Sequence, residues 1–135
     1  MKPPEAMNAL VAWLDEKGYS VDFDKKGDDS VALADKIVSI NTTRSAETQL
    51  YILLHECGHV LIHHNDRLIG YREVQENFEE RTDIHKVFQV MEEAEAWKRG
   101  RYLARRLGIE VNEEKWNRDL SRALNKYIKW AAGVL

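Results

Sequence analysis

The stretch LLHECGHVLIHH, residues 53–64, places four histidines and one glutamate within an apolar segment. From about Ser45 onward, apolar residues recur at i, i+3, i+4, i+7, i+10 and i+11, which is the spacing of one helix face. These residues are Leu50, Leu53, Leu54, Cys57, Val60 and Leu61. The spacing predicts a buried helix that carries the polar residues of the stretch, and it places Cys57 among the packed core residues.

The segments before this helix predict a first helix and a small sheet. Pro3 and Pro4 suit the start of a helix, and helically spaced apolar residues follow over about 14 residues until Gly18 ends it. Strand candidates and a turn come next: YSVDF (19–23), the turn KKGDDS (25–30), VALA (31–34) and KIVSIN (36–41). We therefore expect a sheet of two or three strands ahead of the buried helix.

The segments after the buried helix predict two long helices. Residues 65–82 are polar and mixed in charge, and we expect a short helix within them. A long helix over 84–107 follows, with Thr82 as its N-cap and Gly108 as the residue that ends it. Asn112 caps a last helix. Its predicted buried face consists of Trp116, Leu120, Leu124, Tyr127, Ile128 and Ala131. The expected fold class is α+β, with an N-terminal helix and two long C-terminal helices.

Length and composition predict one soluble domain. The 135 residues suffice for a single core, so we expect one domain over 1–135. The net charge of −3 argues against a general polyanion binder, so direct binding of nucleic acid is not expected. Cys57 is the only cysteine, which favours a reducing compartment. Because the sequence shows no signal peptide and no apolar run of about 18 residues, it predicts a cytoplasmic protein without a membrane partner.

The five residues HECGH, 55–59, have the spacing of a metal-binding motif. Two histidines four residues apart project from one helix face, so His55 and His59 can bind one zinc ion at about 2.0 to 2.1 Å. Glu56 lies about 100° around the helix from His55, where it can take a proton from a water that zinc activates. The alternative is that the histidines only pack or form hydrogen bonds. The position of the motif, within a helix and opposite its apolar stripe, favours zinc.

Catalytic zinc needs a third protein ligand, and the nearby histidines do not provide it. On a continuous helix His63 lies eight residues, about 12 Å, beyond His55, which is too far to share an ion. We expect His63 and His64 to complement the dipole at the helix C-terminus, with contact to a substrate as the alternative.

A better candidate for the third ligand lies on the predicted helix 84–107. Counted from Glu93, one helical face continues through Ala96, Trp97, Gly100, Leu103, Ala104 and Leu107. Gly100 costs about 1 kcal/mol relative to alanine within a helix, which indicates that another backbone approaches it. If that backbone belongs to the His55 helix, Glu93 completes a His2Glu site. Glu92 and Glu95 point about 100° and 200° away from Glu93 around the helix. We therefore expect each of them either to face solvent or to contact a ligating side chain without binding the ion itself.

HECGHVLIHH followed by EAEAWKRG resembles the ImmA/IrrE metallopeptidases. These are gluzincin-type enzymes with HExxH on one helix and a motif of the form E-x-E-A-N-x-F-A on the next. Glu93, Glu95 and Ala96 match that motif, and the zinc ligand of the family falls on Glu93. Trp97 stands where asparagine is usual and Gly100 where alanine is usual, which indicates a divergent branch of phage or mobile-element type.

The resemblance covers roughly residues 36–107. It implies a short twisted sheet packed on the HExxH helix. Relatives cut transcriptional repressors, often beside a helix-turn-helix domain. This chain has no room for such a domain, so a repressor partner is expected on another polypeptide.

Together these observations predict a zinc-dependent endopeptidase. His55, His59 and Glu93 hold Zn2+, and Glu56 activates water. A peptide substrate is expected to lie extended along the edge of KIVSIN. Two alternatives stay open: a non-catalytic zinc-containing regulatory module that binds a protein partner, and a zinc hydrolase acting on another bond. The candidate donors to the oxyanion are Tyr51, Tyr71, His85 and Tyr102.

Overall fold

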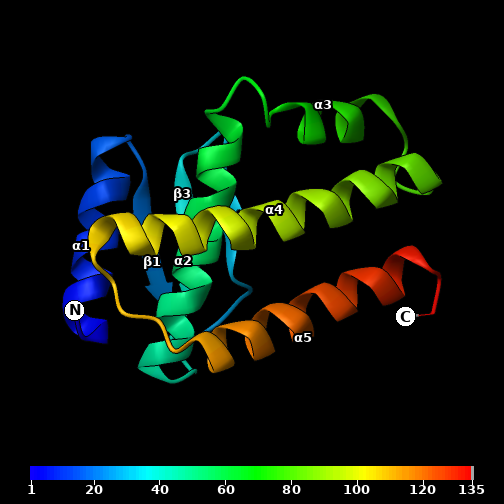
Figure 1. The fold of residues 1–135 in the computed structure, drawn as a ribbon. Coiled ribbons are helices and arrows are strands. Elements are labelled where there is room, and N and C mark those ends of the chain that lie inside the picture. The colour runs from blue at the N-terminus through cyan, green and yellow to red at the C-terminus, as the bar shows by residue number, and fades with distance from the viewer. Residues whose placement is uncertain (135) are drawn as a thin grey trace.

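Five helices and three strands make up the computed structural model, which describes residues 1–134, and one of the helices is central (Figure 1). Their order is α1 (Pro3–Glu16), β1 (Ser20–Asp24), β2 (Ser30–Ala32), β3 (Ile37–Asn41), α2 (Ala46–His63), α3 (Gly70–Asn77), α4 (Asp83–Leu107) and α5 (Glu113–Ala131). The α+β class is confirmed, and α3 is the short helix expected within 65–82. No helix among the described residues is long and apolar enough to span a membrane.

The predicted helix ends are confirmed by their local chemistry. Three helices begin after a residue whose side chain accepts a hydrogen bond from the backbone N–H three positions later, which satisfies a donor of the first turn. These caps are Ser45 for α2, Thr82 for α4 and Asn112 for α5. α4 ends at Gly108, which adopts a left-handed φ of 70° that glycine tolerates without strain.

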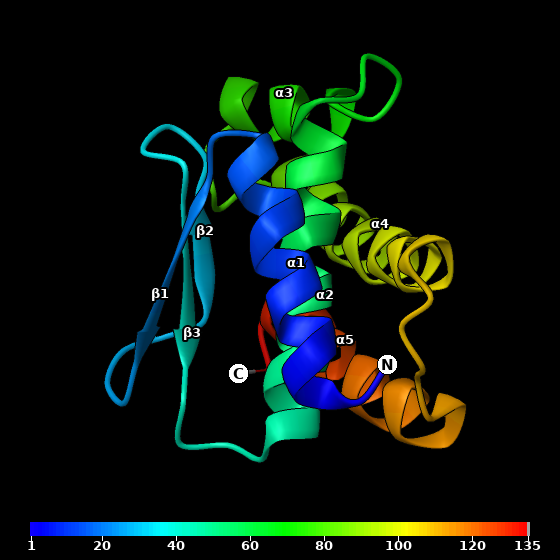
Figure 2. The ribbon, with the colours of Figure 1, turned by 90° about the vertical axis from the view of Figure 1, so that its left-hand side faces the viewer.

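The sheet has the strand order β1-β3-β2. β1 pairs with β3 in parallel and β2 pairs with β3 in the antiparallel sense. Val38 and Ile40 of β3 are buried in the core, and α1 and α2 cover that side of the sheet (Figure 2). Both edges of β3 are paired, so the prediction that a substrate lies along the edge of KIVSIN is wrong. The physical reason is that β2 folds back beside β3, which leaves β2 at the edge of the sheet.

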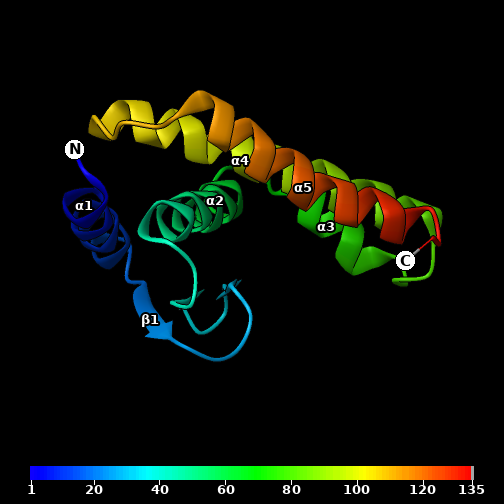
Figure 3. The ribbon, with the colours of Figure 1, turned by 90° about the horizontal axis from the view of Figure 1, so that it is seen from below.

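The core is built around α2. Leu53, Leu54, Cys57 and Val60 expose no surface, which confirms that the Cys57 thiol is packed in the core. Seen from below, α2 lies between the sheet on one side and the pair α4 and α5 on the other (Figure 3). The helix that carries HECGH is therefore fixed on several sides by packed neighbours.

Two glycines set the distance between α2 and α4. A Cβ at Gly100 of α4 would overlap the carbonyl oxygen of Leu54 on α2, and a Cβ at Gly58 of α2 would overlap that of Ala96 on α4. The close approach inferred from Gly100 is thus confirmed, and Gly58 makes the reciprocal contact. Because neither position has room for a side chain, the two helices meet at backbone distance.

The predicted buried face of α5 is only partly right. Trp116 is buried, whereas Ile128 is 54% exposed. The reason is the direction of α5, which runs along α4 away from the central helix, so its second half extends beyond the core (Figure 1). Helical spacing alone does not show where a helix leaves the core.

Candidate metal centre

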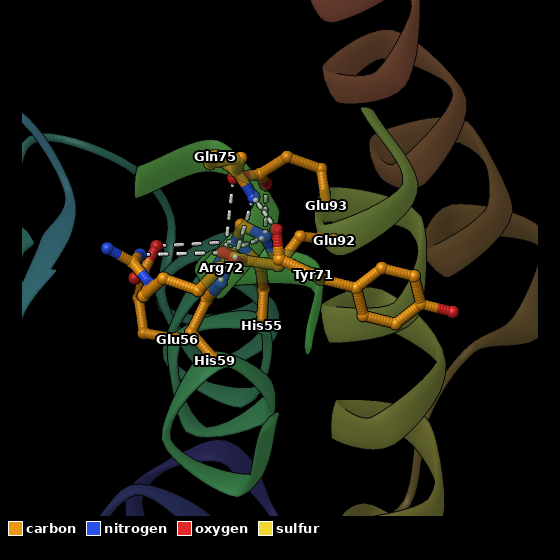
Figure 4. Close-up of polar contacts among 8 residues, drawn as sticks. All are labelled: His55, Glu56, His59, Tyr71, Arg72, Gln75, Glu92 and Glu93. Atoms are coloured by element: carbon orange, nitrogen blue, oxygen red, sulfur yellow. Dashed lines mark hydrogen bonds and ion pairs between the residues drawn. The ribbon is translucent and has the colours of Figure 1, made fainter. Parts of the chain in front are cut away.

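Side chains from α2 and α4 converge on one point between the two helices (Figure 4). Nε2 of His55 lies 2.8 Å from Oε2 of Glu93, and Nε2 of His59 lies 3.2 Å from Oε1 of the same carboxylate. The two Nε2 atoms are 3.2 Å apart. One ligand atom from each of these three residues lies within 4.8 Å of the others, a grouping that is compatible with a metal ion. The structure thus brings together the three residues that the sequence selected as ligands.

The helix contact explains why these three residues meet. His55 and His59 are one turn apart on α2, and Gly58 lies between them against the backbone of α4. The indole of Trp97 stacks on the His55 imidazole, with ring centroids 4.6 Å apart and planes 16° from parallel. Trp97 is buried, so it limits how far the His55 ring can turn. A tryptophan in place of the asparagine usual at this position thus has a packing function here.

The outer nitrogen of His59 also has an acidic neighbour. Oε2 of Glu92 lies 3.0 Å from Nδ1 of His59, and Glu92 is buried. α3 supports this carboxylate, because Nη2 of Arg72 and Nε2 of Gln75 donate to it at 3.5 and 3.3 Å. Of the two roles considered for Glu92, the structure shows contact with a candidate ligand, His59, from outside the cluster. Such a contact fixes the orientation of a metal-ligating imidazole.

Glu95, the other acidic alternative, lies apart from this cluster. Its Oε1 accepts a hydrogen bond at 2.7 Å from Nε of Arg99, one turn further along α4.

The electrostatics of the cluster favour positive charge between the acids. Burial would lower the pKa of His59, but its contacts with Glu92 and Glu93 outweigh burial and raise the pKa to about 10. Burial likewise opposes protonation of His55, and its contacts with Glu56 and Glu93 raise its pKa. Burial alone would raise the pKa of Glu93, yet His55 and His59 hold it well below its usual range. Without a metal ion, protons supply the positive charge that these carboxylates stabilise.

Glu56 lies beside the cluster. Its Oε1 is 3.3 Å from Nδ1 of His55, and only 5% of the residue is exposed. Like His55, His59 and Glu93, it lines a cleft of about 400 Å³. A buried carboxylate next to an imidazole and open to a cleft can accept and release a proton.

The four candidate oxyanion donors lie outside the residues that line this cleft. The Tyr51 hydroxyl accepts a hydrogen bond from the backbone N–H of Asn112, and Nδ1 of His85 contacts backbone carbonyl oxygens of α3 and the residue after it. Tyr71 points away from the cluster in Figure 4, and Tyr102 is exposed on α4. None of the four is therefore placed to contact a group bound at the cluster.

Tyr127 of α5 lines the cleft instead. Burial raises the pKa of its phenol, and the nearby charge of Glu93 raises it further. The hydroxyl is therefore a stable hydrogen-bond donor next to the candidate ligands. The sequence pattern places Tyr127 on a buried helix face and does not identify it as a site residue. The available signal is that Tyr127 shares a helix face with polar residues of α5, which also line the cleft.

His63 and His64 are separate from the cluster, as the helix geometry predicted. His63 is the last residue of α2 and His64 is its C-cap. Nε2 of His64 pairs with the hydroxyl of Tyr19 at 3.1 Å. The histidines that make the stretch look metal-rich are thus divided between the cluster and the end of the helix.

A helix bearing HExxH, with a carboxylate from an adjacent helix as the third candidate ligand, is an arrangement found in the HExxH class of metallopeptidases. The model of the peptidase M78 family, described as the IrrE N-terminal-like domain, matches residues 14–115. The chain belongs to this family, which confirms the resemblance seen in its motifs. A search of curated proteins and a search of solved structures each give no significant match.

Proposed function

We propose that this chain is a zinc-dependent endopeptidase that hydrolyses a peptide bond in a protein substrate. The observation that carries the proposal is the convergence of His55, His59 and Glu93, with Glu56 beside them, on a cleft. Membership of a peptidase family supports it independently.

The residues present fit a divalent metal ion. Two imidazole Nε2 atoms and one carboxylate face a common point, and the other ring nitrogen of His59 is in contact with Glu92. Two histidines and one glutamate are the donor set of one group of catalytic zinc sites, and a carboxylate partner on a ligating imidazole is usual there. Zinc held by His55, His59 and Glu93 would supply Lewis-acid activation of water and of the peptide carbonyl.

The protein groups around that point have separate roles in peptide hydrolysis. Glu56 accepts the proton of the attacking water and passes it to the amine that leaves. The hydroxyl of Tyr127 donates a hydrogen bond to the carbonyl oxygen as negative charge develops there. Both side chains line the same cleft as the ligands, so one bound peptide can reach them together.

The edge strand offers a place for the peptide backbone. β2 is at the edge of the sheet, and its residues Ser30 and Val31 line the cleft. An extended peptide that pairs with β2 would present a backbone carbonyl toward His55 and His59. This is strand addition, in which main-chain hydrogen bonds supply affinity and neighbouring side chains supply selectivity.

The natural substrate that we propose is a regulatory protein of the cytoplasm, such as a transcriptional repressor on another polypeptide. The motif resemblance to the ImmA/IrrE metallopeptidases, whose relatives cut transcriptional repressors, supports a regulatory protein as the target. A chain with one buried cysteine and no disulfide suits a reducing compartment.

The test compares zinc-loaded protein with its Glu56→Gln variant on a degenerate peptide library read by mass spectrometry. Wild type is expected to bind about one equivalent of zinc and to cleave library peptides, since the ligand set is complete. Glu56→Gln is expected to keep the zinc and lose cleavage by at least about 100-fold, because the amide cannot accept the proton. Glu95→Gln is the matched control, since its carboxylate pairs with Arg99 outside the cluster.

Three outcomes would contradict the proposal in different ways. Zinc binding below about half an equivalent at neutral pH would remove its basis. Cleavage that survives in Glu56→Gln would show that another group or a contaminant is responsible. Stable zinc without any cleavage would favour the non-catalytic regulatory module or a hydrolase of another bond.

A further inference from the structure

α5 forms one wall of the cleft. The match to the family model ends at residue 115, so most of this wall lies outside the matched region. Five α5 residues line the cleft, at positions i, i+3, i+4, i+7 and i+8, which form one helical face. They are Asp119, Arg122, Ala123, Lys126 and Tyr127. One face of α5 is thus directed at the candidate metal centre.

Most charged groups on the outer part of the cleft have partners. Arg44 pairs with Asp29, Arg72 lies 3.5 Å from Glu92, and Asp119 accepts a hydrogen bond at 2.7 Å from Nζ of Lys115. Each of these pairs leaves no net charge for a substrate to neutralise.

Arg122 and Lys126 differ from these groups. Both are exposed, both line the cleft, and neither forms an ion pair or a side-chain hydrogen bond within residues 1–134. The three acids at the cluster, Glu56, Glu92 and Glu93, face the histidines or Arg72, so the charge left unbalanced at the α5 wall is positive. A bound group with negative charge would complement it.

The spacing of the two cations limits where that negative charge lies. Arg122 and Lys126 are four residues apart, about 6 Å along α5, so both can reach one carboxylate or two adjacent acidic side chains. Lys126 precedes Tyr127, which lines the cleft together with Glu93. Because both cations line the cleft that His55, His59 and Glu93 also line, one extended peptide can reach the basic pair and the cluster together.

We propose that Arg122 and Lys126 select peptide substrates that carry Asp or Glu close to the cleaved bond. The inference rests on the proposed peptidase function and adds a substrate class to it. Arg122 supplies a planar pair of donors that matches a carboxylate, and Lys126 supplies a mobile point charge beside it.

The experiment first maps cleavage by the zinc-loaded full chain on the degenerate peptide library. It then measures kcat/KM for matched peptides that differ only by Glu or Gln at each position near the cleaved bond. Wild type is expected to prefer the Glu peptide by about threefold to fivefold at one or two adjacent positions, because solvent weakens the pairing of a carboxylate with exposed cations. The preference is expected to shrink with added salt.

Variants assign the preference to the two cations. Arg122→Gln/Lys126→Gln is expected to bring the Glu/Gln ratio of kcat/KM close to one, and Arg122→Glu/Lys126→Glu is expected to reverse it. The control is Arg118→Gln/Lys129→Gln, which removes two exposed cations of α5 that do not line the cleft. Zinc content and far-ultraviolet circular dichroism confirm that each variant keeps the metal and the fold.

The results separate this inference from the function on which it rests. Cleavage with no preference for acidic residues, or an equal change in the control, would overturn the selectivity and leave the peptidase intact. If the wild type cleaves no library peptide, the proposed function fails and the selectivity falls with it. A preference that the Arg122 and Lys126 variants abolish and the control retains supports both.

Discussion

Oε2 of Glu92 lies 3.0 Å from Nδ1 of His59, while Nε2 of the same ring faces Glu93. We therefore expect Glu92→Gln to weaken zinc binding by about 10-fold to 100-fold without removing a ligand, because the carboxylate orients the imidazole and increases its basicity. Competition with a chromophoric chelator measures this affinity. Glu95→Gln serves as the control, and equal affinities of the two variants would show that the Glu92 contact does not act on the metal.

Tyr127→Phe is expected to lower kcat by about 10-fold to 100-fold while the zinc content stays at one equivalent, because the hydroxyl acts on the developing oxyanion. Steady-state kinetics on a peptide found in the library provide the measurement. Tyr102→Phe, which removes the hydroxyl of an exposed tyrosine on α4, should behave as wild type. A Tyr127→Phe variant with unchanged kcat would exclude the hydroxyl from catalysis.

The metal-free protein should lose stability as pH rises above neutrality. The pKa of His59 is about 10 in the folded protein against an ordinary value of 6.5, so protonated His59 stabilises the fold fully below about pH 6.5. That contribution is lost between about pH 6.5 and 10. The lowered pKa of Glu93 acts in the opposite sense, since its contribution is present above its ordinary value of 4.5 and is lost as pH falls.

Urea unfolding with a chelator present, at several pH values from 5 to about 9, measures this dependence. His59→Gln removes the titrating imidazole and should flatten the alkaline decline. A metal-free wild type whose free energy of unfolding rises with pH across this range would contradict the assignment.

The motif residues could be predicted from the sequence because local geometry decides them. His55 and His59 share a face on any continuous helix, and the Ser45 cap and the apolar stripe fix that helix. Glu93 could be predicted because Gly100 required a close helix contact. Tyr127 and the edge position of β2 depend on how α5 and the strands pack in three dimensions. The sequence shows that Tyr127 shares a helix face with polar residues of α5, but it does not show that this face meets the cleft or that β2 is at the edge, so both were missed.

Gly58→Ala tests whether backbone contact between α2 and α4 holds His55, His59 and Glu93 together. A Cβ at this position overlaps the Ala96 carbonyl oxygen, and a backbone atom at a helix crossing cannot move without separating the helices. We expect a loss of about 3 kcal/mol or more in the free energy of unfolding, at or above the usual cost of overpacking. Gly70→Ala is the matched control, because a Cβ there meets no atom within 4 Å. Alanine favours helix over glycine by about 1 kcal/mol, so Gly70→Ala should keep or raise the stability. Equal stabilities of the two variants would show that the helices can separate at little cost, and the spacing of His55, His59 and Glu93 would then need another explanation.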